Sequence, residues 1–453
     1  MMAIYNAITA FTNFIWGLPI LVILVGGGLF ITIRLGFFQF TKFPYIMKQT
    51  FGKMFAKTEK EEGALSPFEA ACSALASSIG AANIVGVPTA IALGGPGAVF
   101  WMWMTALIGC ATKFSEVSLG IKYREKNEVG DWVGGPAYYL RHAFPGNLGK
   151  FIAAFASAAL MLEIVPSVAT QSLSVCSSVA ELGINKTITA VVMLAVVVLV
   201  VCGGIQRIGQ ITSKLVPLMA LLYATCVIII LVKNASGIPA AFGAIFSSAF
   251  TGHAAVGGFA GAAVTATIRW GAARGCYSNE AGMGEAAYAH ATAHTDHPAR
   301  QGFWGVFEVF VDTIIVCTLT ALMVLTSGIW NAEGVAPDQM PVKIFASNFG
   351  TIGSVILSVC IVLFVLSTII VIIFYCEKNA EALFGHKFSL VMRVACFAAI
   401  IYGAYADVSN LYMWLDFLLM GMVIPNMIGL CILSGEVKEM KDDFFNNKEL
   451  VNK

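Results

Sequence analysis

Charged residues are scarce in this chain. Of its 453 residues only 12% are Asp, Glu, Lys or Arg, whereas 58% are hydrophobic. A water-soluble domain carries about 25% charged residues, because its surface must be solvated. The composition therefore excludes a soluble globule of this length and indicates a protein embedded in lipid. The net charge of +1 gives no global field that would attract a nucleic acid.

Motifs for enzymatic chemistry are also lacking. No two of the 11 cysteines stand at CxxC spacing, and most lie in apolar runs, where cysteine packs as a small hydrophobe. The sequence contains no P-loop, no GxSxG and no HExxH motif. We therefore expect neither ATP-driven transport nor an enzyme.

Long apolar stretches are what the sequence has instead. About 20 apolar residues suffice for a helix to cross a bilayer, so these stretches predict an all-α, multi-pass integral membrane protein with about eleven spans. The predicted spans are 13–33, 66–92, 96–120, 150–181, 187–203, 209–232, 256–285, 301–327, 351–375, 388–406 and 411–434.

The distribution of basic residues predicts the sidedness of these spans. One set of alternate loops, together with the C-terminal tail at 435–453, carries most of the Lys and Arg residues. The opposite set holds only Lys186, Lys233 and Lys343. Because basic loops stay in the cytoplasm, we expect the N-terminus outside and the tail inside.

Two predicted spans are interrupted. Span 2, at 66–92, is rich in Gly and Ala and holds Pro88, and span 7, at 256–285, is similarly rich and holds Arg269. Broken helices persist in membranes only where they line a cavity, and interruptions at matching positions of two halves point to an inverted-repeat transporter. The alternative is that the small residues merely allow close helix packing.

Several long strings resemble the alanine/glycine:cation symporter family, whose fold is similar to that of LeuT-type carriers. They are SALASSIGAANIVGV (73–87), GGPGAVFWMW (94–103), ATKFSEV (111–117), GGPAYYL (134–140), GGFAG…IRWGAARG (257–275), SNEAGMG (278–284), HPARQG (297–302), DTIIVCTLTAL (312–322) and IPN (424–426).

The resemblance implies a single transmembrane domain with a 5+5 inverted repeat. The repeats would be residues 66–232 (spans 2–6) and 256–434 (spans 7–11), preceded by one extra helix at 13–33. It also implies import of alanine or glycine coupled to Na⁺ across a prokaryotic plasma membrane. The substrate would bind between the breaks of spans 2 and 7, flanked by spans 4 and 9.

Family motifs assign the substrate site by resemblance. An unwound backbone around Gly80, Ala81 and Ala82 would offer N–H groups to the substrate carboxylate, and Asn83 an amide oxygen to Na⁺ or to the ammonium group. The alternative for Asn83 is a structural bond to its neighbours. The remaining candidates are Gln171 and Ser174 in span 4, Gly271 in span 7 and Ile372 in span 9, which replaces a tryptophan of the family.

The coupling cation has its own set of candidates. By the same resemblance, the carbonyls of Ala76 and Ile79 would face Na⁺, opposite the hydroxyls of Ser367 and Thr368. Hydroxyls within a span more often bond their own helix, so the motif carries this assignment.

Two ionisable residues within spans need a separate explanation, because such residues are functional candidates by default. Glu163 could lie solvated or paired with an arginine near the inner mouth, could bind a cationic group of a larger substrate, or could titrate and give proton coupling. Arg269 lies where span 7 should break, and it needs a partner or water; Glu280 and Asp312 are the candidate partners. Two other functions stay open: transport of a larger or polar amino acid, and a membrane sensor without transport.

Overall fold

The computed structural model describes residues 2–54, 64–251, 260–332, 334–406 and 408–452, which are almost entirely helical. The described residues form one small antiparallel sheet, in which β1 (Glu125–Lys126) pairs with β2 (Trp132–Val133). The predicted all-α class is therefore confirmed in its helical character.

In the N-terminal half α2 continues into α3 through a π-helical turn, whereas α6 ends at a non-helical break that is followed by a second π-helical turn and α7. Its helices are α1 (Met2–Ile15), α2 (Leu18–Leu21), α3 (Gly27–Arg34), α4 (Phe38–Thr41), α5 (Phe43–Gln49), α6 (Pro67–Ser78), α7 (Val87–Gly94), α8 (Ala98–Lys122), α9 (Pro136–Ala143), α10 (Gly146–Ala180), α11 (Lys186–Val201), α12 (Gly204–Lys233) and α13 (Ile238–Thr251).

The C-terminal half repeats the alternation of long and short helices. The π-helical turn η5 (Phe310–Cys317) joins the helix that ends at Val309 to the helix that begins at Thr318. The helices are α14 (Ala260–Asn279), α15 (Ala286–His290), α16 (Pro298–Val309), α17 (Thr318–Ser327), α18 (Met340–Phe349), α19 (Thr351–Phe384), α20 (His386–Gly403), α21 (Val408–Ile432), α22 (Ser434–Asn446) and α23 (Lys448–Asn452).

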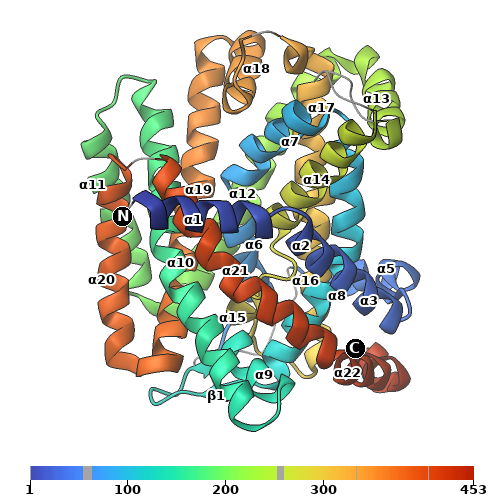
Figure 1. The fold of residues 1–453 in the computed structure, drawn as a ribbon, viewed down its shortest axis with the longest axis vertical. Helices are drawn as coiled ribbons and strands as arrows, with labels where there is room; N and C mark the ends of the chain where they lie inside the picture. Colours follow the sequence, from blue (N-terminus) through green and yellow to red (C-terminus); the bar gives the residue numbers. More distant parts are fainter. Residues whose placement is uncertain (1, 55–63, 252–259, 333, 407, 453) are drawn as a thin grey trace.

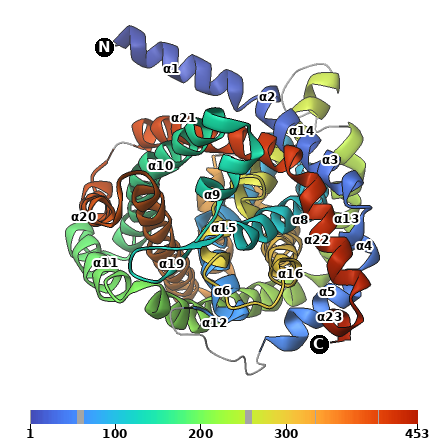
Figure 2. The same cartoon turned by 90° about the horizontal axis from the view of Figure 1, so that it is seen from below.

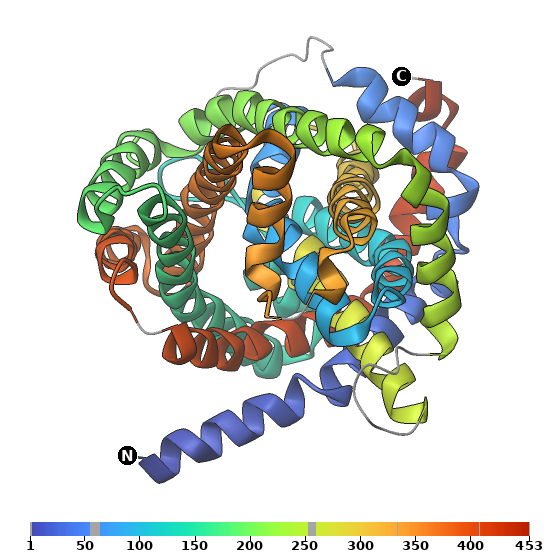
Figure 3. The same ribbon diagram turned by 90° about the horizontal axis from the view of Figure 1, so that it is seen from above.

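The helices gather around α6. In both end views α6 lies inside the bundle, with α10, α11, α19 and α20 on one side and α8 and α16 on the other (Figures 2 and 3). The short helices α13 and α18 lie at one end of the molecule, and α9, β1 and α22 at the opposite end (Figure 1). Neither α13 nor α18 nor the helical form of the tail was predicted from the sequence.

Span 2 is broken where its sequence predicts. Ser66 begins α6 with a capping box shared with Glu69, and Pro67 occupies the first turn, where its missing N–H does no harm. The helix ends at Ile79, whose backbone is extended (φ −76°, ψ 96°). The chain resumes as the π-helical turn η3 (Ala82–Gly86) and α7, and the two halves are bent by 49°.

Span 7 is broken at a different place from the one expected. We expected the break at Arg269, but α14 is helical through that residue to Asn279. The non-helical segment is 280–285, where Glu280, Gly282 and Gly284 have positive φ values. The glycine beside the expected break, Gly271, serves packing instead, because a Cβ there would lie 2.3 Å from the carbonyl oxygen of Ala98.

The helices that could cross a membrane can be compared with the eleven predicted spans. Among the described residues seven helices are long and apolar enough to cross a membrane, or eight if the bent pair in span 2 counts as one. Three other predicted spans coincide with α8, α11 and α14, which are helical but shorter or more polar. The count of eleven stays a prediction, and the start of span 7, at 256–259, lies outside the described residues.

Candidate functional site

The break in span 2 forms a tight polar turn. The backbone N–H of Gly80 donates to the Oδ1 atom of Asn83 at 2.9 Å, so the asparagine side chain holds the turn closed. A Cβ on Gly80 would lie 3.2 Å from the hydroxyl of Thr368, which explains the glycine at this close approach. Ala81 and Ala82 follow, and both are half-buried.

Two of the four predicted cation ligands meet at this break. The hydroxyl of Thr368 donates to the carbonyl oxygen of Ala76 at 2.9 Å and also lies 3.0 Å from the carbonyl oxygen of Phe364. Ile79 lies at the same end of α6, where the chain leaves the helix. Ser367 faces elsewhere, because its hydroxyl lies 3.5 Å from the sulfur of Met219 on α12.

A buried carboxylate lies on the other side of Asn83. The Nδ2 atom of Asn83 donates to Asp312 at 2.6 Å and to the hydroxyl of Ser278 at 3.0 Å. Ser278 and Thr313 in turn donate to the second carboxylate oxygen of Asp312 at 2.8 and 2.7 Å. Asp312 is fully buried, and it connects span 2 to the end of α14. Sequence analysis missed this role, although an acid inside an apolar run is a visible signal.

The other predicted substrate residues lie on α10 and α19. Gln171 is half-buried, and its Oε1 atom is buried without a partner in the described part of the chain. The hydroxyl of Ser174 donates to the carbonyl of Thr170 in its own helix. Ile372 is 3% exposed and lies one helical turn beyond Thr368 on the same face of α19.

Glu163 lies in the middle of α10 and is only 4% exposed. Across the described ranges its carboxylate forms no hydrogen bond and no ion pair, and the charged groups that face it are acidic, Glu280 and Asp416. A solvated position or an arginine partner at the inner mouth, one of the three interpretations above, is therefore wrong. The other two interpretations remain.

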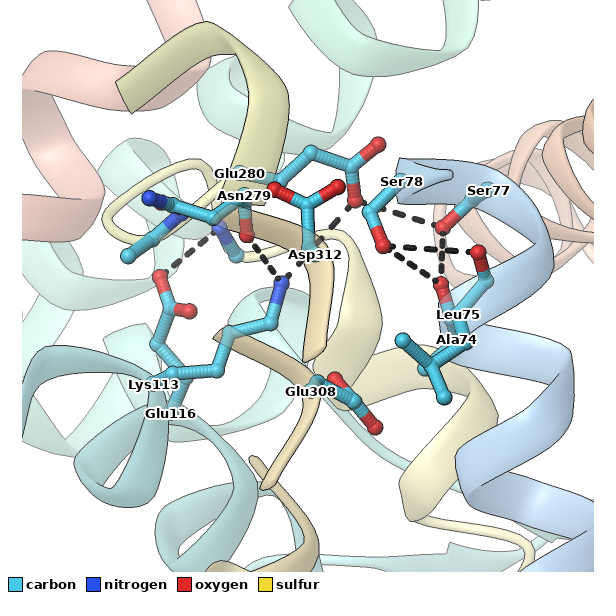
Figure 4. Close-up of polar contacts among 12 residues, drawn as sticks. Ala74, Leu75, Ser77, Ser78, Lys113, Glu116, Asn279, Glu280, Glu308 and Asp312 are labelled. Carbon is cyan, nitrogen blue, oxygen red and sulfur yellow. Dashed lines mark hydrogen bonds and ion pairs between the residues drawn. The ribbon is translucent and has the colours of Figure 1, made fainter. Parts of the chain in front are cut away.

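The expected pairing of Arg269 is also wrong. Arg269 is exposed and lies over the ring of Trp270 at 5.8 Å. The partner of Glu280 is Lys113 of α8, whose Nζ atom lies 3.9 Å from its Oε2 atom. Figure 4 shows Lys113 and Ser77 approaching Glu280 from different helices. Sequence analysis passed over Lys113, although it too is a charge inside a span.

The comparison with known proteins decides the family. The sodium:alanine symporter family matches residues 1–453. The chain belongs to this symporter family. It is 40% identical to the sodium/alanine symporter AgcS of Methanococcus maripaludis, with 95% of each chain covered. It is 48% identical to the uncharacterized transporter YflA of Bacillus subtilis, with 97% of this chain and 93% of that one covered.

Membership in the sodium:alanine symporter family makes the chain a cation-coupled amino-acid symporter of the membrane and not an enzyme. The fold agrees with that of a Na⁺-coupled sialic acid symporter in its substrate-bound outward-open state. The TM-score is 0.51 at 12% identity, with 94% of this chain and 86% of that chain covered. The resemblance to the family is therefore confirmed.

Proposed function

We propose that this symporter imports a small neutral amino acid of the alanine or glycine type together with Na⁺, by alternating access. The observation that carries the proposal is the contact between the Thr368 hydroxyl and the Ala76 carbonyl, 2.9 Å apart at the break of span 2. Carbonyls at the end of a half-helix are the groups that coordinate Na⁺ in transporters of this kind.

The proposed cation site is built from α6 and α19. The carbonyl of Ala76 lies 2.9 Å from the hydroxyl of Thr368, and in the proposed site the carbonyl of Ile79 joins them while Ser367 completes the set by turning away from Met219. A hydroxyl that donates to a carbonyl still has lone pairs to offer a cation. The carboxylate of Asp312, bonded to Asn83, supplies negative charge near this site.

The proposed substrate site lies next to the cation site. Within the turn at 80–83 the N–H of Gly80 is bonded to Asn83, so the N–H groups of Ala81 and Ala82 would bind the carboxylate of the amino acid. The Oε1 atom of Gln171, which has no partner among the described residues, would accept from its ammonium group. Ser174 and Ile372 border the side chain of the substrate. We leave out Gly271, because its close packing on Ala98 leaves no space for a ligand.

The proposal includes the two inverted repeats, 66–232 and 256–434, with the N-terminus outside and the tail in the cytoplasm. The position of the basic residues supports this sidedness. Lys122 is the last residue of α8 and Lys126 lies in β1, at the end of the molecule where α22 lies (Figure 1), and Lys122 pairs with Glu436 of that helix.

Uptake by the purified full-length protein in proteoliposomes tests the proposal. With a panel of labelled amino acids we expect Na⁺-dependent accumulation of alanine or glycine. One charge moving through ~100 mV yields about 2.3 kcal/mol, enough for about 50-fold accumulation, so an inside-negative potential should increase uptake. Uptake that is equal in Na⁺ and K⁺ would contradict Na⁺ coupling, and no uptake of any amino acid would favour a sensor.

One observation favours a second candidate, proton-linked uptake of a larger or polar amino acid. Glu163 is a buried carboxylate without a described counter-ion, and such a group must be neutralised by a proton or by a bound cation. Uptake that follows an imposed pH gradient in the absence of Na⁺ is the outcome that would select this candidate.

A further inference from the structure

The backbone of the broken segment of span 7 needs hydrogen-bond partners from other parts of the protein. Residues 280–285 are non-helical, with φ of 56° at Glu280, 97° at Gly282 and 80° at Gly284. In lipid no water can satisfy such a backbone, so protein groups must supply the hydrogen bonds. The source of these bonds identifies the residues that fix the shape of the break.

Two side chains from one turn of α8 form hydrogen bonds with the broken segment and with the residue just before it. The Oε1 atom of Glu116 accepts from the backbone N–H of Gly282 at 3.1 Å and of Gly284 at 2.8 Å. The Nζ atom of Lys113 donates to the carbonyl oxygen of Asn279, the last residue of α14, at 3.0 Å. The two side chains, three residues apart, share a face of α8 and point toward the same segment (Figure 4).

The two side chains match the backbone groups they contact. Lys113 is a donor and contacts the C-terminal carbonyl of α14, where the helix dipole is negative. The Oε1 atom of Glu116 accepts from N–H groups, and its Oε2 atom has no hydrogen-bond partner in the described part of the chain. Both side chains are fully buried, so these bonds form away from water.

The same contacts connect the break to span 2. The Oε2 atom of Glu280, 3.9 Å from Lys113, accepts from the hydroxyl of Ser77 of α6 at 3.2 Å. Two residues before Glu280, Ser278 bonds to Asn83 and Asp312. A shift of the 280–285 segment would therefore displace groups at the proposed cation and substrate sites.

The last span completes the arrangement. The Nδ2 atom of Asn426 on α21 donates to Oε1 of Glu116 at 2.8 Å and to the carbonyl of Gly282 at 2.9 Å, and its Oδ1 atom accepts from the hydroxyl of Tyr139 on α9 at 2.5 Å. Four of the strings singled out from the sequence, at 111–117, 134–140, 278–284 and 424–426, therefore meet at one buried point.

We propose that Lys113 and Glu116 are positioning residues for transport: they hold the break of span 7 in the shape that aligns Ser278 and Glu280 with span 2. This inference rests on the proposed function for its transport readout. Neither residue needs to touch the substrate, since each acts through the segment it holds.

The test compares Glu116→Ala and Lys113→Met with a matched control, Ser115→Ala, in the full-length protein in proteoliposomes. Ser115 is also fully buried on α8, but its hydroxyl bonds only its own helix, at the carbonyl of Ala111. We expect the KM for the amino acid and the Na⁺ concentration at half-maximal uptake to rise about tenfold or more in the two variants, the effect of one lost bond to a charged group. The control should stay near wild type, and Glu116→Asp and Lys113→Arg should recover part of the loss.

Hydrogen–deuterium exchange of the same proteins gives a readout that does not depend on transport. We expect the amides of 280–285 to exchange faster in Glu116→Ala, and also in Glu116→Met, which has no acceptor oxygen, should the alanine variant fail to fold, with the amides of α10 unchanged. Unchanged exchange at 280–285, or a loss of Vmax with wild-type KM and Na⁺ dependence, would overturn the inference. A wild-type protein without Na⁺-dependent uptake would overturn the proposed function, whereas the exchange experiment would still decide the role of the two residues.

Discussion

At the scale of single residues, a substitution of Glu163 distinguishes Na⁺ from H⁺ as the coupling ion. A glutamine at this position cannot exchange a proton. If Glu163 carries a proton, Glu163→Gln should keep Na⁺-driven uptake but flatten its dependence on pH. The measurement is the initial rate of uptake at fixed Na⁺ across a pH series.

Glu181→Gln is the control for this experiment, because Glu181 lies exposed at the end of the same helix, α10. Its pH profile should match that of the wild type. An unchanged profile in Glu163→Gln would remove Glu163 from the coupling mechanism and leave its burial unexplained.

Residue identities alone predicted some of the site chemistry but not the partners. Thr368 and Ala76 were assigned by motif, and the structure brings them together. The pairing of Arg269 with Glu280 was wrong, because helical periodicity gives the face on which a residue lies but not which helix packs against it. Lys113 reaches Glu280 only through the packing of α8 on α14, a tertiary relation that a single sequence does not contain.

At the scale of elements, the tail helix α22 is held to the end of α8. Lys122 and Tyr123 both bond the carboxylate of Glu436. Burial alone would raise the pKa of Glu436, but these hydrogen bonds bring that pKa below its ordinary value of 4.5. The attachment is therefore fully present above the ordinary value and is lost as the pH falls through the lower folded-state value.

We expect Glu436→Gln to release α22, as faster proteolysis or hydrogen exchange of 434–452 at neutral pH, while the wild-type tail loosens only below pH 4.5. The effect should be small and weakened by salt, because the pair is about one-third exposed. Glu439→Gln, at an exposed position of the same helix, should behave as wild type. Equal release in both variants would mean that apolar packing alone holds the tail.

The two broken spans show how far composition predicts an element. In span 2 the small residues lie at the break itself and Pro88 lies in the first turn of the helix that follows it, so the prediction was correct in position. In span 7 the glycines serve two purposes that composition cannot distinguish. Gly271 allows α14 to approach α8, whereas Gly282 and Gly284 adopt positive φ in the break. The expected break at Arg269 was wrong for this reason.

At the scale of the whole molecule, the proposed cation site links two elements that are far apart in the sequence, α6 and α19. A cation that binds this folded arrangement and not the unfolded chain stabilises the protein by an amount that depends on its concentration. At a hundredfold excess over Kd this stabilisation is about 2.7 kcal/mol, which raises Tm by a few degrees in a protein of this size.

We therefore expect the Tm of the purified protein to rise with NaCl but not with KCl or choline chloride at equal ionic strength, at one fixed scan rate. Thr368→Val keeps the shape of the side chain and removes the hydroxyl 2.9 Å from Ala76, so this variant should lose the Na⁺-specific rise. Ser358→Ala removes a hydroxyl from the same helix that bonds Ser178 instead, so it should keep the rise. Because each comparison is made within one variant, the change in basal stability cancels. A Na⁺-specific rise that persists in Thr368→Val would place the cation elsewhere, and the cluster of Asp312, Asn83 and Ser278 would then be the next site to test.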